Sequence, residues 1–325
     1  AGMLRSLAFA RRRFASSAGS GAPTRIADLV AAREADSADA PALVVPGSDV
    51  RWTYGEFVDR ARCFAAGLAE MGYRPGERLG ARLDNSEHLL VALVGASLVG
   101  ADVETAKTAE ALMHIDCRGT IVHYADAAVA GAMLGAHEPI AVGGGAITEP
   151  IVHYDILIEA FRGHKETASL PPGASVSSYF FSTQKAATEA ALVANAASSS
   201  EALAIKGNGG DRVCVSVPLA HPMGFGFGAL AAFHAGATVV LPSLAGGAEA
   251  AAAATMDAMA NEKCTLMLAD SHTLKALPAG LEKPPEGMEG FRGGLTKIGS
   301  GDAIGLGEPR TWAGVGFKTV GKPPE

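Results

Sequence analysis

Aromatic and charged residues are both scarce in this sequence of 325 residues. Aromatic residues make up 6% and charged residues 19%, whereas hydrophobic residues make up 48%. An intrinsically disordered chain is therefore excluded, because disorder goes with few apolar and many charged residues. A chain of this length buries a large core and is predicted to form two domains or subdomains.

The sequence also lacks a basic surface. It has 27 Lys and Arg against 34 Asp and Glu, which gives a formal net charge of −7. No dense run of basic residues follows residue 25. Because binding to DNA or RNA requires a basic face, the composition excludes nucleic acid as a partner.

Cysteine is rare, and its spacing fits no metal motif. Cys63, Cys117, Cys214 and Cys264 lie far apart, with no C-x-x-C pair among them. We expect buried free thiols, no metal site and no resident cofactor. Thiols of this kind fit a reducing compartment or the mitochondrial matrix.

Residues 213–248 contain no acidic residue, lysine or arginine, so their length raises the question of a membrane span. Pro218, Pro222, Pro242 and several glycines interrupt this stretch. We therefore predict pieces of a buried α/β core and no transmembrane helix.

The first 23 residues differ from the rest of the chain. They contain Arg5, Arg11, Arg12 and Arg13, and the first acidic residue is Asp28. An arginine-rich, serine-rich and acid-free segment is typical of a mitochondrial presequence. The segment predicts a targeting-like arm over 1–23 and a location in the mitochondrial matrix or on the matrix side of the inner membrane. A disordered basic tail is the alternative.

After this arm, predicted strands and helices alternate, which indicates an α/β fold with parallel sheets covered on both faces. We expect a first α/β subdomain over residues 24–170 and a second over 171–325, separated near a proline-rich stretch. The predicted helices span residues 26–35, 53–71, 89–99, 108–116, 127–134, 225–234 and 249–261. The predicted strands span residues 42–45, 78–83, 120–123, 211–218, 237–242 and 264–268.

Two stretches carry a resemblance to a known family. The first contains WTYGEF at 52–57, MGYRPGER at 71–78 and DNSE at 84–87. The second contains PLAHPMG at 218–224 and HAGATVV at 234–240. Their order and spacing resemble those of the adenylate-forming (AMP-binding, acyl-CoA synthetase-like) superfamily. The resemblance implies the layered αβαβα N-terminal region of that fold, with two similar sheet subdomains and without the mobile C-terminal domain.

The same resemblance implies a degenerate nucleotide site. The family's phosphate loop is rich in glycine, but no glycine occurs from Ala174 to Lys206, and only Ser182, Thr183 and Lys185 remain as a remnant. We expect a helix start at this place, with Glu189 repelling phosphate. His221 and Gly224 stand in their family context and imply an acyl or adenine pocket.

Other family features are missing. Residues 312–319 lack the tyrosine and the Mg²⁺-binding glutamate of the family, and the sequence stops at Glu325 before the family's closing domain. From these losses we predict a pseudoenzyme, and hence no enzyme. It would serve as an accessory subunit of a large mitochondrial assembly, with other protein subunits as partners. The alternatives are a residual acyl, acyl-CoA or nucleotide-binding protein, and a ligase completed by another chain.

Overall fold

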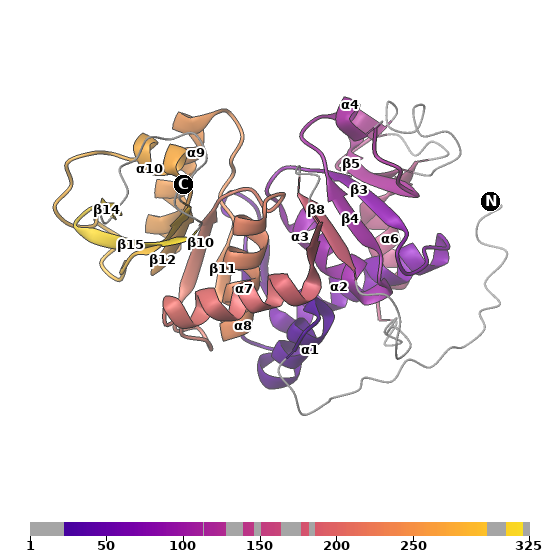
Figure 1. Cartoon of the computed structure of the whole chain (residues 1–325), viewed down its shortest axis with the longest axis horizontal. Coiled ribbons are helices and arrows are strands. Elements are labelled where there is room, and N and C mark those ends of the chain that lie inside the picture. The colour runs from indigo at the N-terminus through magenta and orange to yellow at the C-terminus, as the bar shows by residue number, and fades with distance from the viewer. Residues whose placement is uncertain are drawn as a thin grey trace.

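Two mixed β-sheets with helices between them make up this computed structural model (Figure 1). The structure describes residues 23–112, 114–127, 139–145, 151–163, 177–181, 186–297 and 310–320. The predicted arm over 1–23 therefore lies almost entirely outside the described residues. Within them, no helix is long and apolar enough to cross a membrane.

The first sheet has seven strands in the order β7-β6-β5-β3-β4-β8-β9. Its strands pair in parallel, except that β8 and β9 form an antiparallel pair. Their bounds are β3 Arg78–Arg82, β4 Asp102–Thr105, β5 Gly119–His123, β6 Ile140–Val142, β7 Val152–His153, β8 Ser178–Phe181 and β9 Ala186–Thr188.

The second sheet has eight strands in the order β14-β15-β13-β12-β10-β11-β1-β2. Its six central strands are parallel, and β2 and β14 pair antiparallel at the two edges. Their bounds are β1 Pro41–Val44, β2 Arg51–Thr53, β10 Arg212–Ser216, β11 Thr238–Val240, β12 Leu266–Ala269, β13 Gly294–Lys297, β14 Arg310–Trp312 and β15 Val315–Val320.

Each sheet takes strands from both sides of the predicted boundary at residue 170. The early strands β1 and β2 join the second sheet, whereas β8 and β9, which follow the boundary, join the first sheet. Leu43 of β1 pairs with Val239 of β11, for example. Each sheet therefore combines strands from the first and the second half of the chain, whereas the predicted division at residue 170 assigns each sheet to one half.

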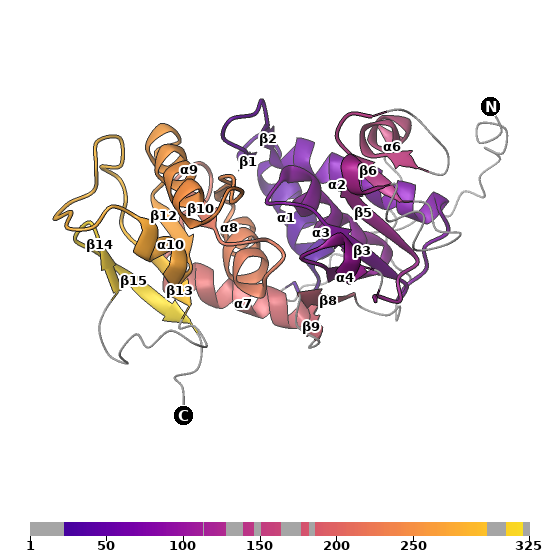
Figure 2. The ribbon, with the colours of Figure 1, turned by 90° about the horizontal axis from the view of Figure 1, so that it is seen from above.

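The helices form three layers, and Figure 2 shows α7 running between the two sheets. Their bounds are α1 Ile26–Ser37, α2 Tyr54–Glu70, α3 Glu87–Val99, α4 Ala109–Leu112, α6 Tyr154–Phe161, α7 Glu189–Ala202, η2 Met223–Ala229, α8 Leu230–Ala235, α9 Ala248–Asn261 and α10 Ser271–Ala276. One core cluster combines α1, α2, α3, α7 and α8 with residues of both sheets. Smaller clusters lie under α9 and α10 and beside α4. This is the predicted αβαβα layering.

The start of α2 follows the sequence prediction. The hydroxyl of Thr53 accepts a hydrogen bond from the amide of Glu56, whose carboxylate accepts one from the amide of Thr53. This reciprocal capping box satisfies two amides that a helix leaves unpaired at its start. It fixes the helix whose buried face includes Phe57, Phe64 and Leu68.

The helix predicted over 225–234 has a different form. Residues Met223–Ala229 form the π-helix η2, and the α-helix α8 follows it. π-helices are rare and occur often at functional sites, because their wider turn displaces the residues around them. Here η2 directly follows the loop that carries His221.

Candidate functional site

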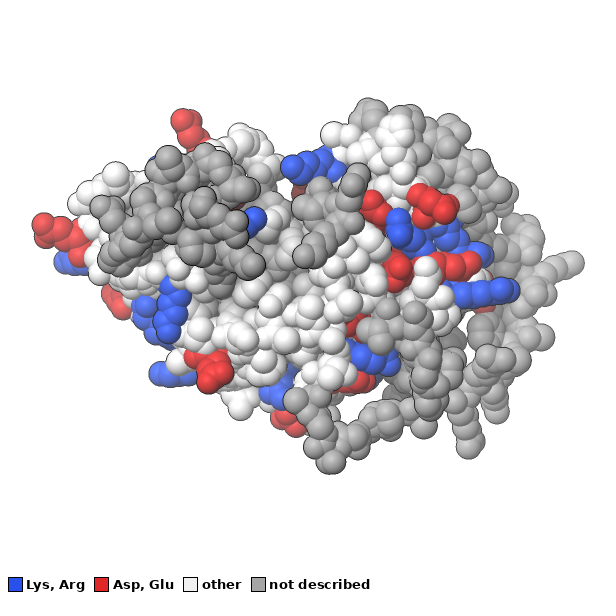
Figure 3. Space-filling model, in the orientation of Figure 1, with Lys and Arg blue, Asp and Glu red and all other residues white. Residues whose placement is uncertain are grey.

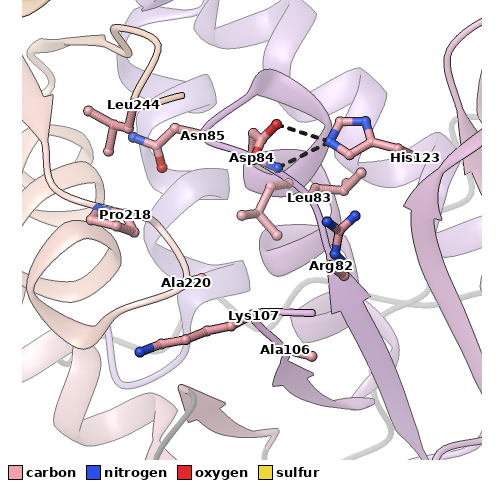
Figure 4. Close-up of a pocket in the computed structure, with 11 residues that line it drawn as sticks. Arg82, Leu83, Asp84, Asn85, Ala106, Lys107, His123, Pro218, Ala220 and Leu244 are labelled. Atoms are coloured by element: carbon pink, nitrogen blue, oxygen red, sulfur yellow. Dashed lines mark hydrogen bonds and ion pairs between the residues drawn. The ribbon is translucent and has the colours of Figure 1, made fainter. Parts of the chain in front are cut away.

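A pocket of about 220 Å³ lies where the carboxyl ends of strands from both sheets meet (Figure 4). In parallel α/β sheets, ligands bind at the carboxyl ends of the strands. One wall follows β3, β4 and β5 and consists of Arg82, Leu83, Asp84, Asn85, Leu89, Ala106, Lys107 and His123. The other wall follows β10 and β11 and consists of Pro218, Ala220 and Leu244.

Asn85 joins the two walls. Its side-chain Oδ1 accepts a hydrogen bond of 2.7 Å from the amide of Leu219. Its Nδ2 donates to the carbonyl oxygens of Val217 and Val215, at 3.3 and 3.4 Å. The loop after β3 is thereby fastened to the loop after β10 by an amide side chain that lines the pocket.

Polar contacts occupy the outer part of the first wall. Arg82 forms an ion pair with Asp126, and Nε2 of His123 lies 3.3 Å from a carboxylate oxygen of Asp84. Lys107, by contrast, is exposed and extends across the cleft toward the loop after β10 in Figure 4. A lysine at this position favours an anionic ligand.

His221 lies in the loop between β10 and η2, as its family context implies. Its Nδ1 accepts a hydrogen bond of 3.0 Å from the amide of Met223, and Nζ of Lys297 lies 3.4 Å from its Nε2. Burial, Lys297 and Lys107 lower the pKa of His221, while Asp270 opposes them. The ring is therefore neutral at pH 7.

Gly224 has a packing role at this site. A Cβ atom on Gly224 would lie 2.2 Å from the carbonyl oxygen of Pro218. The first turn of η2 therefore rests directly on the loop that lines the pocket. This close approach requires glycine for a steric reason.

The nucleotide-loop remnant Ser182, Thr183 and Lys185 lies outside the described residues. The strands β8 and β9 flank it as an antiparallel pair, and α7 begins at Glu189. The helix start expected in this stretch lies at Glu189, after the extended residues 186–188, and the hydroxyl of Thr188 caps the helix. The hydroxyl group of Thr105, at the end of β4, lies 3.4 Å from the carbonyl oxygen of Phe180 on β8 and 3.3 Å from the carbonyl oxygen of Ala220. It can donate a hydrogen bond to either of them.

Glu189 also differs from expectation. Its side chain is fully buried and faces Arg25, whose Nε lies 3.7 Å from the carboxylate. The guanidinium group of Arg25 also donates a hydrogen bond of 3.0 Å to the backbone carbonyl oxygen of Ser97 on α3. Glu189 thus belongs to the central helical layer, and the expectation that it repels phosphate has no support in this geometry.

Sequence reasoning missed Lys297 and the linking role of Asn85. Lys297 ends β13 with its side chain at His221, and its signal was a lone lysine at the end of a buried apolar strand. Asn85 stands in the recognised DNSE stretch. Among the described residues no group of three or more His, Cys, Asp or Glu side chains could hold a metal ion. The four cysteines are buried free thiols.

Comparison with known proteins identifies one family. A family model described as AMP-binding enzyme matches residues 30–115 and 186–315. The acyl-CoA ligase sidI of Aspergillus fumigatus is 33% identical over 100 residues, which cover 29% of this chain and 17% of that protein.

Solved structures show the same fold. An anthranilate CoA ligase in complex with anthranoyl-AMP superposes with a TM-score of 0.69 at 16% identity, covering 86% of this chain and 56% of that chain. The N-terminal domain of FACL13 from Mycobacterium tuberculosis superposes with a TM-score of 0.66 at 19% identity, covering 85% of this chain and 70% of that chain. This chain thus spans little more than half of the anthranilate ligase.

The prediction that the chain is no enzyme is wrong. The similar proteins are named acyl-CoA ligases, and the fold is that of active adenylate-forming enzymes. That prediction rested on the glycine-free stretch from Ala174 to Lys206, on the missing tyrosine and glutamate in residues 312–319 and on the end of the sequence at Glu325. Residues 182–185 and 321–325 lie outside the described part of the chain, and Glu189 is buried beside Arg25.

Proposed function

Because this chain belongs to the AMP-binding enzyme family, we propose that it is the part of an acyl-CoA ligase that binds a carboxylic acid and ATP and joins them. The carboxylate oxygen attacks the α-phosphorus of ATP, the bond from that phosphorus to the bridging oxygen breaks, and pyrophosphate leaves. An acyl adenylate remains, ready for transfer of the acyl group to a thiol.

The observation that carries this proposal is the pocket between the two sheets. It lies at the carboxyl ends of β3, β4, β5 and β10, and its lining includes Lys107. His221 and Lys297 add hydrogen-bond donors at the ends of neighbouring strands. Every ligand of the proposed reaction is an anion, so the lysine that extends into the cleft, Lys107, supports it.

Carboxylate-dependent exchange of pyrophosphate into ATP, measured on the full chain, tests the proposal. Binding of a non-reactive acyl sulfamoyl adenosine, measured by calorimetry, tests it without turnover. We expect Lys107→Ala to weaken this binding about tenfold, which is about 1.4 kcal/mol. Lys283→Ala removes an exposed lysine distant in sequence and serves as the control. A folded chain that neither exchanges pyrophosphate nor binds the adenosine analogue would overturn the proposal.

A second proposal concerns location and partners. The arginine-rich segment with Arg5, Arg11, Arg12 and Arg13 supports import into the mitochondrial matrix. There the chain would associate with other protein subunits. Import of the full chain into isolated mitochondria, read by protection from added protease, tests this, and R11Q/R12Q/R13Q should abolish the protection. Native electrophoresis of mitochondrial extracts tests the association, which migration as a free monomer contradicts.

A further inference from the structure

His221 and Lys297 present two hydrogen-bond donors to the same space. The amide N–H of Met223 donates to Nδ1 of His221 at 3.0 Å. A neutral imidazole has one acceptor nitrogen and one N–H nitrogen. Since Nδ1 accepts, the proton lies on Nε2, and Nζ of Lys297 is 3.4 Å from that atom. Nε2–H and the ammonium group are both donors, and an acceptor placed beside them would satisfy both.

Backbone hydrogen bonds fix the main chain at His221, and strand pairing fixes it at Lys297. The amide of His221 donates to the carbonyl oxygen of Pro218 at 3.0 Å, and the amide of Phe225 donates to the carbonyl oxygen of His221 at 3.1 Å. Lys297 is the last residue of β13. Strands β10, β12 and β13 are parallel neighbours, so the two side chains meet at one edge of the sheet.

The charges around this pair favour a ligand with a single negative charge. Lys297 and Lys107 both lower the pKa of His221, and Asp270, which lies just after β12, raises it. The carboxylate of Asp270 accepts a hydrogen bond of 2.8 Å from the amide of Thr273 and caps α10. Two lysines and one aspartate leave one positive charge in excess beside a neutral ring.

We propose that His221 and Lys297 bind a second carboxylate of the acyl substrate, which makes the substrate a dicarboxylic acid. This inference rests on the function proposed above. The carboxylate that reacts loses its charge when it becomes a mixed anhydride, so a fixed cation would stabilise it before the reaction more than after it. Interactions stronger in the ground state than in the transition state do not accelerate a reaction. A remote carboxylate keeps its charge throughout and gains the same contact at every stage.

The pair stands on different strands from the predicted phosphate site, although the loop carrying His221 lies beside the end of β8, where Oγ1 of Thr105 lies within hydrogen-bond distance of the carbonyl oxygens of both Phe180 and Ala220. The nucleotide-loop remnant follows β8 of the seven-stranded sheet, whereas His221 and Lys297 follow β10 and β13 of the eight-stranded sheet. On the charge argument above we assign the pair to the acyl end of the substrate, and the affinity for AMP tests this assignment.

Matched acids of equal length test the proposal on the full chain. Affinities of hexanoate against adipate and of decanoate against sebacate are measured by calorimetry, together with that of AMP. We expect the preferred dicarboxylate to bind at least tenfold more tightly than its monocarboxylate partner. Lys297→Gln should reduce this ratio to about one, and Lys283→Gln, which removes an exposed lysine, should leave it unchanged.

Two substitutions of His221 distinguish the loss of a hydrogen-bond donor from a loss of folding. His221→Gln retains an acceptor for the Met223 amide and an N–H donor, so it should keep part of the preference, whereas His221→Phe should lose it. Thermal melts confirm that each variant folds. Equal or tighter binding of the monocarboxylates by the parent chain overturns the dicarboxylate proposal alone. A loss of AMP affinity in Lys297→Gln equal to the loss of adipate affinity overturns it too, because the pair then binds the adenylate phosphate. If neither acid nor adenylate analogue binds and no exchange occurs, the proposed function fails as well.

Discussion

A single buried carboxyl group controls part of the pH dependence of stability. Glu189 is fully buried at the start of α7. Burial raises the pKa of Glu189 from 4.5 to about 7, although Ser97 and Arg25 oppose the rise. The folded chain therefore binds this proton more tightly than the unfolded chain does. The contribution to stability is present below pH 4.5 and is lost as the pH rises through about 7.

We predict that Glu189→Gln raises the melting temperature at pH 8 and has little effect at pH 4.5. At pH 8 the parent chain must bury an ionised carboxylate at a cost on the order of 3 kcal/mol, which the neutral amide avoids. Thermal melts of both chains at the two pH values measure the difference. Glu201→Gln, on the exposed side of the same helix, should change the melting temperature little at either pH. An equal shift at both pH values for Glu189→Gln would contradict the prediction.

At the scale of secondary-structure elements, the π-helix η2 is the feature that the sequence did not predict. The apolar run after Pro222 contains Phe225 and Phe227 and reads as one helix, because hydrophobic periodicity reports a helical face but not the width of the turn. The π form depends on contacts made after folding. Gly224 lies against the carbonyl oxygen of Pro218, and Gly226 lies against Leu192 of α7.

We predict that Gly224→Ala destabilises the chain by about 1–3 kcal/mol, as overpacked positions commonly do. The added methyl group would lie 2.2 Å from a backbone oxygen, so η2 or the loop carrying His221 must move. Thermal or urea unfolding measures the loss. Gly316→Ala is a matched control, because a Cβ on Gly316 meets nothing within 4 Å. Equal stabilities of the two variants would show that η2 tolerates the methyl group.

Local features of the fold could be predicted from the sequence, whereas its long-range pairings could not. The capping box of Thr53 and Glu56 lies within four residues, and it predicted α2 correctly. The pairing of β1 with β11 joins Leu43 to Val239, and nothing in either apolar run specifies that partner. The same holds at the site: His221 was visible in its motif, but its contact with Lys297 depends on strand order.

At the scale of the whole molecule, the pocket depends on how the two sheets are held together. Tyr54 of α2 donates a hydrogen bond of 2.7 Å to the carbonyl oxygen of Ala237, which joins the first half of the chain to the second. Figure 3 shows that charged side chains gather toward the two ends of this face and that its middle is largely free of them. Inside the molecule one apolar cluster extends across both halves, and Asn85, which lines the pocket, adds a polar link between them.

The link through Asn85 gives a prediction that separates its two hydrogen-bonding roles. Asn85→Ala leaves the buried amide of Leu219 without the acceptor that lies 2.7 Å away. A buried donor without a partner costs about 1–3 kcal/mol. Asn85→Asp keeps that acceptor but replaces a donor with an anionic oxygen facing the carbonyl oxygens of Val215 and Val217. We therefore expect both variants to melt at lower temperature than the parent chain.

Hydrogen exchange at the Leu219 amide distinguishes the two variants. Exchange should accelerate in Asn85→Ala, because the amide loses its partner, and should remain slow in Asn85→Asp, because the carboxylate still accepts. Ser48→Ala removes an exposed turn contact and should change neither the melting temperature nor this exchange rate. If the Leu219 amide stays equally protected in all three variants, the link between the two loops does not depend on Asn85.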